Sequence, residues 1–323
     1  MNIKTILALA SASMLLASCS QNQPEPAEEG KYELDLVVAS PTGAPAVALY
    51  PFLDKPTSVV DINANPDNVV GYLTDGSGKD IVICPTNAGV AAIQNKGASY
   101  KLASVLTFGN FYLASTGKDD NDTLDADDYV VAFQQGKVPD KIFKYCFSDV
   151  EFSNLHYVDA ASDASACLIK GINASDNNAE VDYVLVAEPS MTVAMGKNAN
   201  AKEKYSLADK YKEKSGGLSI MQAAIFVSNF TPKEKIDAFL EATEENVSAF
   251  LQDPSVIDSY VESIGEEKAV AKLGVPSSAV LKAVTNNGNR MGLGYQKAKD
   301  HKQDISNFLS LFNITVNEEV YYQ

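Results

Sequence analysis

The stretch "DIVICPTNAG", residues 80–89, decides the fold. Its apolar run at 81–83 is typical of a buried strand, and Pro85 ends that strand because proline cannot donate to a sheet ladder. We expect a helix to begin at Thr86 and Asn87 and to run through "AGVAAIQNKG" to a glycine stop. These two polar side chains either cap the helix or face a bound molecule at the end of the strand.

The same alternation of strand and helix extends to both sides of this stretch. "YELDLVVAS" (32–40) and "SVVDINAN" (58–65) are expected strands, each followed by a helical or turn segment. Strand, helix, strand, helix, strand predicts a parallel α/β sheet. In such sheets ligands bind outside the carboxyl ends of the strands. The candidate ligand-binding residues in the loops after these strands are Thr42, Gly43, Thr86, Asn87, Thr107 and Asn110.

A second α/β run begins near residue 129. Gln134 follows the strand in "YVVAFQQGK" and faces either the cleft or solvent. Glu188 follows the strand in "VDYVLVAEPSMT", where a free carboxylate would favour an amine, an amidine or a ring N–H and would oppose an anion. Alternatively, Glu188 is a structural acceptor for a helix start or a hinge. Asn289 and Arg290 in "NNGNRMGLGY" could complete a site for a negative group from the first lobe, although we expect the arginine to be solvated.

The first 30 residues indicate export. Residues 1–18 have the layout of a secretory signal, and "LASC" (16–19) resembles the bacterial lipobox, in which cleavage leaves Cys19 lipidated. The polar segment 19–30 is typical of a disordered tether. We therefore expect an exported protein anchored to the cell membrane by lipid at Cys19.

Composition excludes several classes of function. A net charge of −16 opposes nucleic acid as a partner. No CxxC pair, HExxH motif or dinucleotide fingerprint is present, so no metal and no cofactor are expected. No G-x-S-x-G elbow occurs, so no catalytic residues are assigned and the protein is not expected to be an enzyme. The alternatives are a secreted lipid-anchored hydrolase with His156 as its base, or a surface lipoprotein without a transport role.

Three further features leave expectations to test. Cys146 and Cys167 either form a disulfide or, like Cys84, are buried free thiols. The acidic stretch 117–128 lacks the glycine and glutamate of a calcium loop and is expected to be a solvated connection between lobes. From residue 231 the pattern is nearly all helical, with Thr231 as a helix cap and a last long helix over 294–313.

In this order the elements resemble the type 2 solute-binding proteins of ABC importers, nearest to the nitrate, alkanesulfonate and thiamine-precursor group. The resemblance covers most of the mature chain. It rests on "GAPAVAL", on "ICPTNAGVAAIQNKGASYKLASVLTFGNFYL" and on "CLIKG…VDYVLVAEPSMT". The residues that match the last motif of the group are Leu168, Gly171, Asp182, Glu188, Pro189 and Thr192.

The resemblance implies the α/β periplasmic-binding-protein fold, with two lobes, each an open and mostly parallel sheet flanked by helices, around a hinge. Residues 31–114 and 227–323 would form one lobe, and residues 115–226 the other. The implied function is to capture a small polar or heteroaromatic solute between the lobes and deliver it to an ABC permease and ATPase, with no bond made or broken. We expect a monomer.

Overall fold

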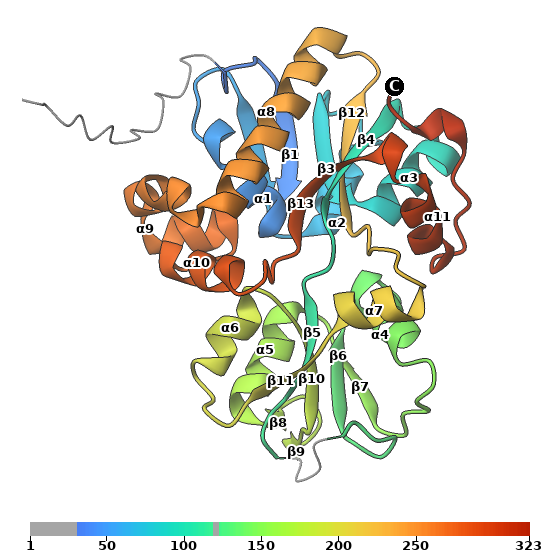
Figure 1. Ribbon diagram of the computed structural model, residues 1–323, viewed down its shortest axis with the longest axis vertical. Coiled ribbons are helices and arrows are strands. Elements are labelled where there is room, and N and C mark those ends of the chain that lie inside the picture. Colours follow the sequence, from blue (N-terminus) through green and yellow to red (C-terminus); the bar gives the residue numbers. More distant parts are fainter. Residues whose placement is uncertain (1–30, 119–122) are drawn as a thin grey trace, which may run out of the picture.

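The computed structural model describes residues 31–118 and 123–323. Figure 1 shows two lobes along the long axis of the molecule, each built around one sheet with helices packed on it. The predicted α/β class is confirmed. The predicted signal peptide, Cys19 and the tether lie outside the described residues. Within the two described ranges, no helix is both long and apolar enough to cross a bilayer.

The stretch 80–89 folds as its sequence predicts. Strand β3 (Ile81–Pro85) passes directly into helix α3 (Thr86–Lys96). The helix ends at Gly97, whose φ of 70° lies in the left-handed region that glycine adopts without the steric cost of a Cβ. The strand therefore passes into the helix with no loop between them.

The buried side chains of β3 fill cores on both faces of its sheet. Ile81 and Ile83 pack in the cluster that includes Phe239 of α8 (Lys233–Gln252), whereas Val82 and Cys84 pack in the cluster that includes α3 and α11 (Lys302–Ser310). Successive strand residues point to opposite faces, so a continuous apolar run is needed where helices cover both. Figure 1 shows α8 on one side of this sheet and α3 and α11 on the other.

The first lobe contains a sheet with the strand order β13-β4-β12-β3-β1-β2. β1 pairs in parallel with β2 and β3, whereas β12, β4 and β13 pair antiparallel. β4 therefore runs in the same direction as β1, β2 and β3, and β12 and β13 run against them, so the sheet is mixed while most of its strands run one way, as expected. The strands besides β3 are β1 (Val37–Pro41), β2 (Val59–Asn63), β4 (Tyr100–Thr107), β12 (Ala223–Ser228) and β13 (Leu293–Lys297).

The second lobe contains a sheet with the order β11-β5-β10-β6-β7. It is also mixed: β10, β6 and β7 are parallel, and β5 runs antiparallel to β10 and β11. Its strands are β5 (Phe111–Ser115), β6 (Val130–Phe133), β7 (Leu155–Val158), β10 (Tyr183–Ala187) and β11 (Lys202–Ser206), with the short pair β8 (Ile172–Asn173) and β9 (Ala179–Glu180) beside it.

Helices cover both sheets. Those of the first lobe besides α3 are α1 (Ala44–Ala48), α2 (Pro66–Gly71), α8 (Lys233–Gln252), α9 (Asp258–Leu273), α10 (Ser278–Asn286) and α11 (Lys302–Ser310), with 3₁₀ turns at Tyr50–Phe52, Pro254–Ile257, Ala298–Asp300 and Glu318–Val320. Those of the second lobe are α4 (Val138–Cys146), α5 (Ala161–Lys170), α6 (Ser190–Met195) and α7 (Leu207–Lys214).

Three expectations for these elements are wrong. The last long helix begins with a strand instead, since β13 pairs with β4. Thr231 does not cap α8, because its hydroxyl donates to Asp80 Oδ1 at 2.6 Å and the helix begins at Lys233. The described parts of the acidic stretch, 117–118 and 123–128, lie between β5 and β6 of one sheet, so they belong to the second lobe and do not connect the lobes; residues 119–122 lie outside the described residues.

Two segments carry the chain between the sheets. Residues 108–110 lead from β4 to β5, and residues 215–222 lead from α7 back to β12. They adjoin each other, since the Gln222 N–H donates to the Thr107 carbonyl at 2.9 Å. Figure 1 shows both segments in the narrow region between the lobes.

Candidate functional site

The carboxyl ends of β1 and β3, with the start of β12, meet at the edge of the first sheet that faces the second lobe. The Thr86 N–H donates to the Gln222 carbonyl at 3.1 Å, which ties the start of α3 to the returning segment. Thr42 and Gly43 follow β1, the strand next to β3. Four of the candidate residues therefore share one sheet edge, which we call the strand-end site: Thr42, Gly43, Thr86 and Asn87.

Thr86 and Asn87 do not cap α3. No side-chain capping bond is made at the start of this helix. Thr86 is 0% exposed, and neither its Oγ1 nor Asn87 Oδ1 has a hydrogen-bond partner among the described residues. Buried polar groups are normally paired, because leaving one unpaired costs the free energy of its lost hydration. Of the two uses that the sequence left open for these residues, the geometry favours contact with a bound molecule.

Thr107 and Asn110 serve the crossing segments. Thr107 Oγ1 accepts from the Ala223 N–H at 3.0 Å. Asn110 Nδ2 donates to the Glu188 carbonyl at 2.8 Å, and the Glu188 N–H donates to the Asn110 carbonyl at 2.9 Å. These two residues lie at the same edge as Thr86, but their polar groups hold the connection between the lobes.

Glu188 forms a buried ion pair between the lobes. Its side chain is 0% exposed, and its Oε1 accepts from Arg290 Nε at 2.7 Å. It also accepts from the N–H and the hydroxyl of Thr192, at 3.0 and 2.9 Å, at the start of α6. The geometry therefore favours the structural role that the sequence left open for this carboxylate.

Arg290 is not solvated as expected. Its side chain is 13% exposed, lies 4.5 Å above the centre of the Tyr112 ring and also bonds Glu203. Burial alone would lower the pKa of Arg290, but its hydrogen bonds to Glu188 and Glu203 outweigh burial and raise it. The backbone N–H of Arg290 donates to Val284 in α10, so this residue joins the first lobe to the second. No local motif in the sequence marks Tyr112, Glu203 or Gln222 as residues of this region.

Gln134 lies at the end of β6 in the second lobe. Its φ is 54°, in the left-handed region, and its N–H donates to the Val158 carbonyl at 3.1 Å. A residue with a Cβ is disfavoured in this conformation, and such strain is concentrated at functional positions. Lys137, on the same turn, pairs with Asp67 of the first lobe at 3.3 Å. The turn that carries Gln134 is therefore in contact with the first lobe.

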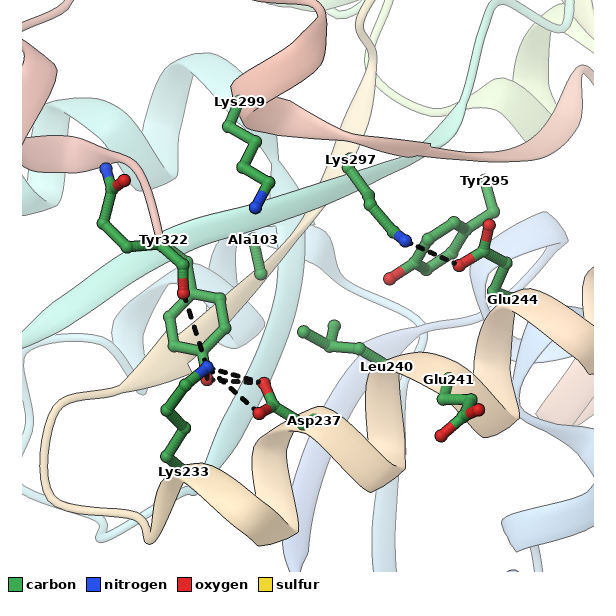
Figure 2. A pocket seen from close by; sticks show the side chains of 11 residues that line it. Ala103, Lys233, Asp237, Leu240, Glu241, Glu244, Tyr295, Lys297, Lys299 and Tyr322 are labelled. Atoms are coloured by element: carbon green, nitrogen blue, oxygen red, sulfur yellow. Dashed lines mark hydrogen bonds and ion pairs between the residues drawn. The ribbon is translucent and has the colours of Figure 1, made fainter.

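One cavity of the described residues lies away from this edge. It has a volume of about 360 Å³ and lies in the first lobe between α8 and β13, and Figure 2 shows the side chains that line it. Its charged groups are largely paired with one another: Lys233 with Asp237 at 3.0 Å, and Lys297 with Glu244 at 3.5 Å. It is separate from the strand-end site.

The described cysteines Cys84, Cys146 and Cys167 are free and buried, so the Cys146–Cys167 disulfide is not formed. Burial raises the pKa of the Cys146 thiol to about 12 and raises that of the other two. Among the described residues no group of histidine, cysteine, aspartate and glutamate side chains is arranged to hold a metal ion.

Solved structures share this architecture. No family model and no curated protein matches the sequence. An ABC transporter protein from Parabacteroides distasonis is 19% identical with a TM-score of 0.71, over 89% of this chain and 98% of that one. The periplasmic aliphatic sulphonate binding protein SsuA from Escherichia coli is 14% identical with a TM-score of 0.60, over 89% and 92%.

A third solved structure has a fold that is named in its description. The Candida albicans CA3427 gene product, described as exhibiting the generic periplasmic binding protein structural fold, is 11% identical with a TM-score of 0.53, over 88% of this chain and 92% of that one. At such identities the likeness establishes the arrangement of the chain and not its ligand. The chain has the periplasmic binding protein fold.

Proposed function

We propose that this protein is the solute-binding component of an ABC importer, which captures a small polar or heteroaromatic molecule between its lobes and delivers it to a permease with its ATPase. The observation that carries the proposal is the buried Thr86 hydroxyl at the strand-end site, which has no hydrogen-bond partner among residues 31–118 and 123–323. Two sheets joined by two short segments form a hinge that can close on a ligand and replace its water with fixed polar groups.

The remaining parts of the proposal rest on the sequence, together with the contacts described above. The ligand contacts are Thr42, Gly43, Thr86 and Asn87 of the first lobe with Gln134 of the second, whereas Thr107, Asn110 and Glu188 hold the hinge. Export and a lipid at Cys19 would keep the protein beside its permease. The lobes would divide a few residues from the predicted bounds of 114 and 226, because β5 belongs to the second sheet and β12 to the first. The first lobe would then be 31–107 with 223–323 and the second 111–214, joined by 108–110 and 215–222. No reaction is catalysed, and the protein acts as a monomer.

A thermal-shift screen tests the function. The purified full chain is unfolded and refolded to remove any carried-over ligand, then melted with anions, amino acids, polyamines, nucleobases and sugars. A ligand at about a hundred times its dissociation constant should stabilise the folded state by about 2.7 kcal/mol. A panel in which no compound raises the melting temperature would contradict a solute-binding role.

A further inference from the structure

The sheet edge that holds the strand-end site also carries Gln222 and Asn289, whose amide oxygens are acceptors of fixed orientation; from here on the strand-end site includes these two residues. The Glu188 carbonyl can only accept, so the Asn110 amide must turn its Nδ2 toward it, at 2.8 Å. Asn110 Oδ1 then accepts from Gln222 Nε2 at 3.1 Å. This relay leaves Gln222 Oε1 as the free atom, and it is buried without a partner in the part of the chain that the structure describes.

The same logic applies at the next antiparallel strands of this sheet edge. Asn289 Nδ2 donates to the Leu293 carbonyl at 2.6 Å, which leaves its Oδ1 as a buried acceptor without a donor among residues 31–118 and 123–323. Leu293 pairs with Thr107, and Thr107 with Ala223, the neighbour of Gln222. These acceptors therefore follow the edge toward the oxygens of Thr86 and Asn87.

The charges at this edge are already paired. Arg290 is held by Glu188 and Glu203, and Lys137 by Asp67. An anion entering here would find oxygen acceptors and no cation free of a carboxylate among these groups. A molecule with N–H or O–H groups would satisfy the acceptors, each of which otherwise loses its hydration without compensation.

We propose that the strand-end site binds an uncharged molecule that presents several N–H or O–H donors, and that it discriminates against anions. This inference rests on the proposed function and narrows its ligand class. The Escherichia coli protein is named for binding sulphonate, but a shared fold does not imply a shared ligand, because proteins of one fold bind unrelated molecules.

Titration calorimetry with matched pairs tests the charge preference. The probes are cytosine against orotate, nicotinamide against nicotinate, and glucose against gluconate, at equal concentrations. In any pair of which at least one member binds, we expect the uncharged member to bind at least about tenfold more tightly. A tenfold difference in affinity corresponds to the cost of leaving one hydrogen bond unmade. If an anion binds more tightly than its neutral partner, the inference fails and the proposed function stands. If neither these pairs nor the broader panel bind, both fail.

Thr86→Val tests whether the bound molecule contacts the Thr86 hydroxyl, which can accept from it or donate to it. The change keeps the shape of the side chain and removes a hydroxyl that has no described partner, so the melting temperature without probe should not fall. Affinity for the bound probe should fall roughly tenfold. Thr243→Val is the matched control: this buried hydroxyl in α8 donates to the Phe239 carbonyl at 2.7 Å, away from the site. It should lower the melting temperature and leave affinity unchanged. A Thr86→Val protein that melts earlier and binds the probe normally would overturn the inference.

Discussion

At the scale of single residues, Gln134 tests whether strain is retained at the site. Its φ of 54° costs a residue with a Cβ about 1–2 kcal/mol, which glycine does not incur. Gln134→Gly should therefore leave the free energy of unfolding unchanged or raise it by up to about 1 kcal/mol, since the greater entropy of an unfolded glycine offsets part of the relief. Urea denaturation measures the change.

The neighbouring glycine supplies the control. Gly136, in the same turn, has a φ of 78°, so Gly136→Ala should lower the free energy of unfolding by about 1 kcal/mol or more. Loss of stability in both variants would mean that the Gln134 side chain supports the fold and is not retained for binding.

The thiols give a second prediction at this scale. Cys84, Cys146 and Cys167 are buried, and burial raises their pKa values, so the reactive thiolate is scarce at pH 8. Ellman's reagent should react slowly with these three in the folded protein and rapidly in guanidinium. A mass lower by about two hydrogens in the unreduced protein would show a disulfide instead.

The residue contacts mark where sequence reasoning stops. The polar ends of β3 and β10 could be predicted, because each follows an apolar run that ends at a turn. The partner of Glu188 could not, since Arg290 lies 102 positions away and the pair forms only when the lobes meet. Whether a carboxylate forms an ion pair depends on the tertiary structure, and no local sequence pattern encodes it.

At the scale of elements, α3 packs so closely on β12 that it has no room for a methyl group. A Cβ on Gly89 would lie 2.1 Å from Cζ of Phe226, a ring that is itself fully buried. Gly89→Ala should lower the free energy of unfolding by about 1–3 kcal/mol through overpacking, despite the better helix propensity of alanine.

Gly71, the last residue of α2, is the matched control because a Cβ there meets nothing within 4 Å. Gly71→Ala should be neutral or raise the free energy of unfolding by up to about 1 kcal/mol. Equal behaviour of the two variants in urea denaturation would contradict the close contact between α3 and Phe226.

The elements also show why the sequence wrongly predicts one long helix over 294–313. The helical pattern of "DISNFLSLF" is realised in α11, but the residues before it form β13. Leu293 pairs with Thr107 of β4, and a bulge separates this pair from the one at Gln296. Strands short enough to be set by a distant neighbour carry little local signal, and tertiary pairing overrides propensity there.

At the scale of the whole molecule, two ion pairs join the lobes, and they differ in how far their side chains are buried. Lys137 and Asp67 form a pair whose side chains are 60% and 70% exposed, and such pairs contribute at most about 1 kcal/mol. Arg290 and Glu188 form a pair whose side chains are 13% and 0% exposed. The buried pair, beside the crossing segments, should therefore control how the lobes are held.

Arg290→Met tests this difference. It leaves the Glu188 carboxylate between the lobes without its cation, and breaking a buried pair in this way costs about 3–5 kcal/mol. We expect a lower free energy of unfolding in urea and a larger radius of gyration in small-angle X-ray scattering, because separation of the lobes lets water reach the carboxylate. Lys137→Met should lower the free energy of unfolding by at most about 1 kcal/mol and should leave the radius of gyration unchanged.

The double variant decides between charge and packing as the cause. Adding Glu188→Gln to Arg290→Met removes the uncompensated charge, so it should recover much of the lost stability and return the radius of gyration toward that of the unmodified protein. If the losses of unfolding free energy from the two substitutions instead add, the loss comes from packing contacts of the Arg290 side chain, such as its stacking on Tyr112. The lobes would then be held by packing and not by the ion pair.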